Sequence, residues 1–209
     1  MMSVSPIDVL IVDDHVMVAQ GLASLLASQS DIRIIGLASN GREALDLFGQ
    51  HQPDIVLMDL RMPEMGGVEA IITICTQFKQ ARIIVLTTYD GDEDIYRGLR
   101  AGAKGYLLKD AEAQELLSAI RAVHAGQQHI PPSVGAKLVE RMGIPELSAR
   151  ELEVLNLMAR GKNNQQISTD LLISESTVKF HTKNIMGKLG AKDRTQAIIT
   201  ALKRGIITI

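Results

Sequence analysis

The stretch IVLMDLRMPEMGG, residues 55–67, decides the fold of this chain. Its first four residues are apolar and end abruptly at one acid, Asp59, and a proline and two glycines follow within a few positions. Four apolar residues bounded by turn-forming residues are typical of a buried parallel strand. An acid directly after such a strand lies at the carboxyl edge of the sheet, where open α/β folds carry their chemistry. Asp59 is therefore a candidate chemical switch, although an acid here can equally cap the following helix.

Strand and helix patterns alternate along the first part of the chain. Apolar strands start near residues 7, 32, 55, 82 and 105, a spacing of roughly 25 residues that is typical of repeated βα units. A helical pattern follows each strand, over residues 16–28, 41–50, 68–78, 92–101 and 112–124. Because crossovers between parallel strands are right-handed, these units predict a doubly wound, five-stranded parallel sheet with helices on both faces, a flavodoxin-like α/β fold.

Polar side chains stand at the carboxyl ends of four of these strands. Asp13 and Asp14 follow the first strand, Asp59 the third and Lys109 the fifth, and Thr87 ends the fourth. Three carboxylates repel one another unless a cation joins them, and hard oxygen ligands suit Mg²⁺. Lys109 and Thr87 can bind the oxygens of a phosphoryl group, which makes Asp59 the nucleophile for an aspartyl phosphate. Taken singly, the acids can also be helix caps, Lys109 a loop lysine and Thr87 a strand-end hydroxyl.

These positions together resemble the receiver domain of two-component response regulators over roughly residues 6–125. The positions that carry the resemblance are Asp13-Asp14, Asp59, Pro63, Gly66-Gly67, Thr87 and Lys109. It implies that Asp59 accepts a phosphoryl group from a sensor histidine kinase. It also implies that Mg²⁺, or Mn²⁺ in its place, is held by Asp13, Asp14, Asp59 and the backbone carbonyl of Arg61. The protein is not expected to be an enzyme, beyond self-phosphorylation from small phosphodonors and autodephosphorylation.

The same resemblance assigns residues that sense or tune the phosphate. Thr87 is the hydroxyl that moves toward it. Tyr106 is either the aromatic switch residue that turns inward with Thr87 or an ordinary packed strand residue. Thr88 is small enough to leave the phosphate approachable, while Arg61 and Tyr89 flank the pocket at positions that tune hydrolysis.

The sequence departs from the family pattern after its lysine. Asp110 follows Lys109, where the family often has a proline joined by a cis peptide bond. A cis bond without proline costs about 3 kcal/mol relative to trans, against under about 1 kcal/mol before proline. The geometry of the Lys109–Asp110 bond is therefore left open.

The two ends of the chain carry opposite charge. Residues 1–125, the expected receiver, hold 10 Lys and Arg against 17 Asp and Glu, a net charge of −7. Residues 126–209 hold 12 against 7, a net charge of +5, which suggests a polyanionic partner unless the split is chance. Residues 126–146 are rich in glycine and proline, and we expect them to form a linker with one short helix at Pro132–Met142.

The last part, residues 147–209, is expected to be a small all-α domain. Ser148 and Glu151 form a capping-box pattern at the start of a helix. Further helical patterns cover residues 164–172, 174–189 and 195–204. A short turn between two helices suggests a helix-turn-helix, whose second helix carries Lys179 and Lys183 outward. Such a helix fits the major groove of double-stranded DNA, although two outward lysines can also be a solvated face.

The segments LSARELEVL, GKNNQQIS and ISESTVKFHTKNIMGKLGAKDRTQA resemble the LuxR-type DNA-binding domain over residues 147–204. The resemblance implies DNA contacts at Thr177, Lys179, Phe180, Lys183 and Lys188, with Thr177 and Lys188 on phosphates. Phe180 either touches a thymine methyl group or packs on its own helix, and His181 is a half-buried structural residue. The last helix is expected to form a homodimer through Thr195, Ile198 and Leu202. Receiver and LuxR-type domain together identify a response regulator of the NarL/FixJ type, a phosphorylation-controlled transcription regulator.

Two other classes of protein remain open. An aspartyl-phosphate phosphatase also uses an acidic nucleophile, but it needs a second acid two residues later, where this chain has Arg61. Alternatively, the helical second domain binds a protein in place of DNA, against which its outward lysines and positive charge argue.

Composition points to a reducing compartment. Cys75 is the only cysteine, so no intramolecular disulfide can form. The first residues, MMSVSPID, lack the basic and apolar regions of a signal peptide, and no apolar run approaches the roughly 18 residues of a membrane-spanning helix. We therefore expect a cytoplasmic protein without a membrane partner.

Overall fold

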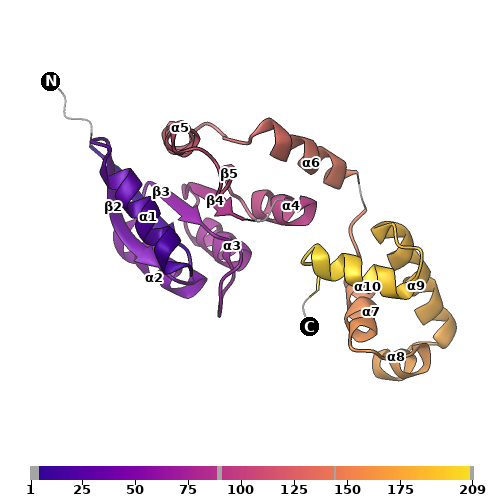
Figure 1. Cartoon of the computed structure of the whole chain (residues 1–209). Coiled ribbons are helices and arrows are strands. Elements are labelled where there is room, and N and C mark those ends of the chain that lie inside the picture. Colours follow the sequence, from indigo (N-terminus) through magenta and orange to yellow (C-terminus); the bar gives the residue numbers. More distant parts are fainter. Residues whose placement is uncertain (1–4, 89–90, 144, 208–209) are drawn as a thin grey trace. The chain divides into compact units, whose positions relative to one another are not determined.

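The computed structural model describes residues 5–88, 91–143 and 145–207 (Figure 1). Its sheet consists of β1 (Ile7–Val12), β2 (Ile32–Ala38), β3 (Ile55–Met58), β4 (Ile83–Thr87) and β5 (Gly105–Leu108). All pairings are parallel, and the strand order is β2-β1-β3-β4-β5. The chain adds β2 on one side of β1 and then β3, β4 and β5 on the other side. This change of winding direction confirms the predicted doubly wound fold.

Helices cover both faces of this sheet (Figure 1). They are α1 (Val16–Ala27), α2 (Gly41–His51), α3 (Gly67–Gln77), α4 (Asp92–Arg100) and α5 (Ala113–His124). Leu26 of α1 and Ile120 of α5 share one buried cluster with Val9 and Ile11 of β1, so these two helices lie on the same face. On the other face, α2 packs against β1 and β2 and against α3.

The β1–β2 pairing contains one irregularity. Val9 pairs with Ile34, but the next residue, Leu10, pairs with Gly36, so β2 holds one extra residue at this point. Beside the bulge, the guanidinium group of Arg33 on β2 donates two hydrogen bonds, each 2.7 Å long, to the carboxylate of Asp8 on β1. A bulge of this kind bends and twists the strand that carries it.

The strand ends are aligned at the carboxyl edge of the sheet. The amide of Asp59 donates to the Val12 carbonyl of β1 at 2.9 Å, and the amide of Lys109 donates to the Thr87 carbonyl of β4 at 2.9 Å. The ladder thus continues one residue beyond the strands. As a result, the side chains that follow β1, β3 and β5 leave the sheet at the same level.

The loop after β3 folds back onto the strand that precedes it. The Gly67 amide donates to the Leu60 carbonyl at 2.9 Å, and a Cβ atom on Gly67 would lie 2.0 Å from the carbonyl oxygen of Asp59. No side chain fits at that distance. Glycine at position 67 therefore lets α3 begin directly beside Asp59.

The chain divides into two compact units, residues 1–90 with 94–137 and residues 91–93 with 138–209. After α5, Gly126 turns the chain with φ of 84°. His129 then forms an isolated parallel bridge with Gly105, the first residue of β5. The linker helix α6 follows at Pro132–Met142, over the range that the sequence predicts.

The second unit ends the chain with four further helices, α7 (Ala149–Ala159), α8 (Asn164–Leu171), α9 (Glu175–Leu189) and α10 (Arg194–Lys203). The capping box of Ser148 and Glu151 at the start of α7 is confirmed. The unit has its own buried core, made of Val154, Leu155, Met158, Ile167, Val178, Ile185, Leu189, Ala197, Ala201 and Ile207. Among the residues that the structure describes, none of the helices is long and apolar enough to span a membrane.

Candidate phosphoacceptor and DNA-binding sites

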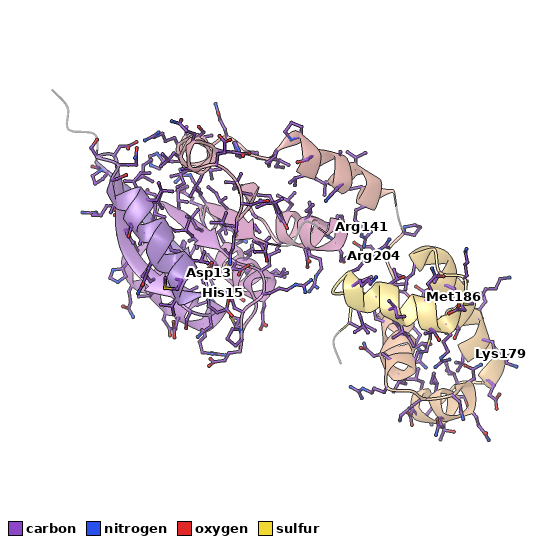
Figure 2. All side chains as sticks on the ribbon, in the orientation of Figure 1. Asp13, His15, Arg141, Lys179, Met186 and Arg204 are labelled. Carbon is purple, nitrogen blue, oxygen red and sulfur yellow. The ribbon has the colours of Figure 1, made fainter. Side chains whose placement is uncertain are left out.

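Three carboxylates meet at the carboxyl edge of the sheet. Asp13 and Asp59 are 4% and 3% exposed, and Asp14 is half-buried. One oxygen from each acid and one ring nitrogen of His15 all lie within 4.8 Å of one another. Asp13 and His15 lie together at the end of α1 nearest the sheet edge (Figure 2). The strand register thus gathers the predicted acids into one cluster.

Lys109 joins two of these acids. Its Nζ atom lies 2.7 Å from Oδ2 of Asp13 and 2.6 Å from Oδ2 of Asp59. Burial lowers the pKa of Lys109, but hydrogen bonds and charge from Asp13 and Asp59 outweigh burial and raise it. The ammonium group therefore stays charged and offsets part of the carboxylate repulsion.

None of the acids acts as the cap of a helix. The N-cap of α3 is Gly66, and the N-cap of α1 is His15, whose side chain makes no capping bond. Oδ1 of Asp59 accepts from the amide of Leu60 at 2.7 Å, and Oδ1 of Asp13 accepts from the amide of His15 at 2.9 Å. The alternative of plain capping acids is therefore wrong for α1 and α3.

The acid cluster is chemically suited to a divalent ion. Its donor atoms include carboxylate oxygens, which Mg²⁺ and Mn²⁺ prefer. The ammonium group of Lys109 already binds two of these acids, Asp13 and Asp59. Sequence reasoning missed His15, whose Nδ1 lies 2.9 Å from Oδ1 of Asp14. Its position directly after Asp13-Asp14 was the available signal.

Two switch candidates lie on the strands beside the cluster. Thr87 and Tyr106 are both fully buried. A Cβ atom on Gly98 of α4 would lie 3.8 Å from Cε2 of Tyr106, so the tyrosine ring faces α4. Thr88, in contrast, is exposed. The arrangement fits both roles foreseen for Tyr106, which is turned inward and packed.

The residues expected to flank the pocket are placed only in part. Nη2 of Arg61 donates to Oδ2 of Asp94 in α4 at 2.9 Å, so its guanidinium group is directed toward that helix. Tyr89 lies outside the described residues. The Lys109–Asp110 peptide bond is trans, because no cis bond occurs in the described chain.

The recognition-helix candidate is α9. Its N-cap Ser174 accepts from the amide of Thr177 at 3.1 Å, which fixes the first turn after α8. Val178, Ile185 and Leu189 are buried, whereas Lys179 and Lys183 are exposed. Lys179 projects outward from α9 (Figure 2). No ion pair joins Lys179 or Lys183 to another described residue, so both charges face solvent.

Phe180 is exposed and has one aromatic neighbour. It is 60% exposed, and its ring meets that of His181 edge-on at a centroid distance of 5.7 Å. His181 is half-buried, as expected, and its Nδ1 atom has no hydrogen-bond partner among the described residues. Phe180 thus packs on its own helix and still presents apolar surface.

Lys188 lies differently from the other lysines of α9. Its Nζ atom donates to Oε2 of Glu151 at 2.7 Å and to the Glu146 carbonyl at 2.8 Å. Glu151 is 4% exposed and also accepts from the Ser148 amide at 2.7 Å. Burial raises the pKa of the Glu151 carboxyl. The hydrogen bonds from Lys188 and Ser148 and the charge of Lys188 outweigh burial and lower this pKa. Lys188 therefore ties α9 to α7, a role that needs no DNA.

On α10, Thr195 is exposed, while Ile198 and Leu202 are half-buried against the core of the unit. The most exposed apolar residue of this helix is Ile199, at 47%, which sequence reasoning did not single out. Its place between the apolar pairs Ala197-Ile198 and Ala201-Leu202 was the available signal.

Comparison with known proteins identifies the family of both units. The pattern of the response regulator receiver domain matches residues 9–121, and that of the bacterial regulatory proteins of the luxR family matches residues 145–201. The first unit thus contains a receiver domain. The chain belongs to the response regulators that join a receiver to a LuxR-type DNA-binding domain, the NarL/FixJ type, and is a two-component transcription regulator.

Individual relatives span nearly the whole chain. The transcriptional regulatory protein LiaR of Bacillus subtilis (strain 168) is 42% identical over 209 residues, which cover 96% of this chain and 99% of LiaR. RcsB of Salmonella enterica serovar Typhimurium, bound to a promoter with the phosphomimetic BeF₃⁻, has a TM-score of 0.75 and 26% identity, with coverage of 96% and 100%. A structure of two RcsB dimers on two parallel DNAs has a TM-score of 0.71 and 26% identity, with coverage of 95% and 99%.

Proposed function

We propose that a sensor histidine kinase phosphorylates Asp59 and that this modification controls DNA binding by the second unit. One observation carries the proposal: Lys109 lies within hydrogen-bond distance of both Asp13 and Asp59, at the edge where the strands end. An ammonium group at that point can bind an oxygen of a phosphoryl group on Asp59.

The transfer is a displacement at phosphorus. Oδ2 or Oδ1 of Asp59 forms the new P–O bond as the P–N bond to the kinase histidine breaks, and the bonding electrons remain on that histidine. Asp13, Asp14, Asp59 and the Arg61 carbonyl would hold Mg²⁺ or Mn²⁺, which would supply positive charge to offset the phosphoryl oxygens. Lys109 contacts one such oxygen, and the buried hydroxyl of Thr87 donates to another. Thr88 leaves the approach to the site open.

The acceptor assignment is tested by labelling with acetyl phosphate in the presence of Mg²⁺. Asp59→Asn removes the nucleophilic oxygen, and we expect no aspartyl phosphate in intact-mass spectra. Asp110→Asn is the matched control, because Asp110 is exposed and lies next to Lys109 without belonging to the cluster. Persistent labelling of Asp59→Asn would mean that the acceptor is another residue.

The output is proposed to be binding of double-stranded DNA by α9. Lys179, Phe180 and Lys183 present charge and apolar surface on its exposed face. Thr177, in the first turn, is proposed to contact a DNA phosphate. The promoter-bound RcsB structure supports DNA as the partner. Such binding also implies a cytoplasmic location. A protein-binding role for the second unit and a phosphatase role for Asp59 have no comparable support, since Arg61 takes the place of the second acid.

We further propose that phosphorylation favours a homodimer on DNA, formed through α10 and in particular through Thr195, Ile198 and Leu202. The RcsB structure with dimers on DNA supports this arrangement. A two-fold dimer reads two half-sites about one helical turn, roughly 34–36 Å, apart.

A gel-shift titration tests the DNA contacts. Lys179→Ala is expected to weaken promoter binding by about 1–3 kcal/mol if it reads a base. Lys79→Ala is the control, because it also removes an exposed lysine, but from the first unit. Unchanged affinity of Lys179→Ala would remove this residue from the interface.

A further inference from the structure

The chain that leaves the receiver sheet is hydrogen-bonded to the outer edge of β5. The amide of His129 donates to the Lys104 carbonyl at 3.0 Å, and the amide of Tyr106 donates to the His129 carbonyl at 3.0 Å. One residue thus makes both bonds of a parallel pairing, on either side of Gly105. The linker helix α6 begins shortly afterwards, at Pro132.

The strand held in this way is the one that carries two residues of the phosphoacceptor site. Tyr106 lies in the middle of β5, where it pairs with Val85 of β4, and Lys109 follows the last residue of the strand. The Lys109 amide is bonded to the Thr87 carbonyl. β5 is therefore hydrogen-bonded to β4 on one side and to His129 on the other.

The pairing also depends on a close approach at Gly105. A Cβ atom at this position would lie 3.3 Å from the His129 carbonyl oxygen and 3.2 Å from Cγ1 of Ile84. Both distances are tighter than ordinary van der Waals contact. The absence of a side chain at Gly105 thus lets the linker lie against β5.

We propose that His129 is a positioning residue: its backbone pairing extends the sheet beyond β5 and couples the state of the Asp59 site to α6. The inference rests on the proposed function. A displacement of Thr87 and Tyr106 on phosphorylation changes β4 and β5, and the two backbone bonds transmit the change to the first residues of the linker. Coupling of this kind is reciprocal, so the pairing of His129 also biases the phosphoryl-binding geometry of Lys109.

The experiment compares two substitutions at the same residue in the full chain. His129→Pro removes the N–H that donates to the Lys104 carbonyl. His129→Ala removes only the ring and keeps both backbone bonds. For each protein, Asp59 labelling by acetyl phosphate and the gain in promoter affinity on labelling are measured.

We expect His129→Pro to be labelled on Asp59, while its gain in promoter affinity falls by about fivefold or more, the lower end of typical allosteric coupling. His129→Ala should retain the gain of the unsubstituted chain. A full gain in His129→Pro would overturn the inference and leave the proposed function intact. If the unsubstituted chain is labelled but shows no gain, the proposed function fails and the inference falls with it.

A second measurement keeps the test decisive if His129→Pro does not fold. Amide hydrogen exchange of the unsubstituted chain is compared before and after labelling, at the amides of Tyr106 and His129. Because the two amides close one pairing, their protection should change together on phosphorylation. Unchanged protection at both amides would also overturn the inference.

Discussion

Lys188 offers a test that separates a structural role from a DNA contact. The sequence predicts that it binds a DNA phosphate, whereas the structure shows its ammonium group on Glu151 and on the Glu146 carbonyl. Lys188→Met keeps most of the aliphatic side chain and removes the charge. We expect this change to lower the thermal stability of the second unit and to leave the salt dependence of DNA binding unaltered.

The magnitude follows from the burial of Glu151. Without Lys188, this carboxylate, 4% exposed, keeps the Ser148 amide as a partner but loses its cation. A buried charged group that loses one partner costs about 1–3 kcal/mol, and up to about 5 kcal/mol where the pair is fully buried. The Lys188 side chain is 27% exposed, which favours the lower range. A loss of about 2 kcal/mol corresponds to a fall in Tm of roughly 8–16 °C for a domain of this size.

The assay combines thermal unfolding with promoter binding at several salt concentrations. Each phosphate contact contributes about −0.9 to the slope of log Kobs against log salt, so a lost contact reduces the slope by about 1. Lys183→Met is the matched control on the exposed face of the same helix. We expect it to reduce the slope, through a lost phosphate contact, or the affinity, through a lost base contact, without a change in Tm.

The structural role would be refuted by the opposite pattern for Lys188→Met. An unchanged Tm together with a slope reduced by about 1 would show that the ammonium group leaves Glu151 and binds DNA. Measurements below the Tm of each variant keep the two effects separate.

Four further outcomes follow from the described geometry. Gly67→Ala places a methyl group against the Asp59 carbonyl and should lower Tm, whereas Gly49→Ala, which has open space around it, should raise it slightly. Lys109→Met should slow acetyl-phosphate labelling by about 10²-fold or more, measured by intact mass. Chelation should abolish labelling, and either Mg²⁺ or Mn²⁺ should restore it. The pKa of Glu151 is lower in the folded state, so its ionised carboxylate stabilises the fold above the unfolded pKa of about 4.3. This stabilisation is lost as the pH falls through the lower folded pKa. Denaturant unfolding of Glu151→Gln at several pH values should lack this pH dependence.

The receiver fold follows from the sequence because its information is local and periodic. The apolar strand at 55–58 and its repeats fix a parallel sheet, and the end of each strand then places one side chain at the same edge. Asp13, Asp59 and Lys109 could therefore be brought together without knowledge of their contacts.

The contacts that the sequence could not give join distant residues through side chains or single backbone bonds. Lys188 meets Glu151 only once α7 and α9 have packed, and Arg61 turns to Asp94 because α4 lies beside it. His129 belongs to a linker whose composition suggests a turn, and its pairing with Gly105 has no pattern to announce it. Such choices depend on packing and not on periodicity.

The strand order also leaves one edge of the sheet exposed to the addition of a foreign strand. His129 occupies part of the outer side of β5, so β2 is the more open edge of the sheet in the described chain. There, the extra residue between Ile34 and Gly36 interrupts the regular spacing of amides, and the Arg33 charge stands beside it. Bulges and charges at an edge oppose the addition of a foreign strand. The open edge of the receiver sheet thus opposes sheet-to-sheet polymerisation at β2.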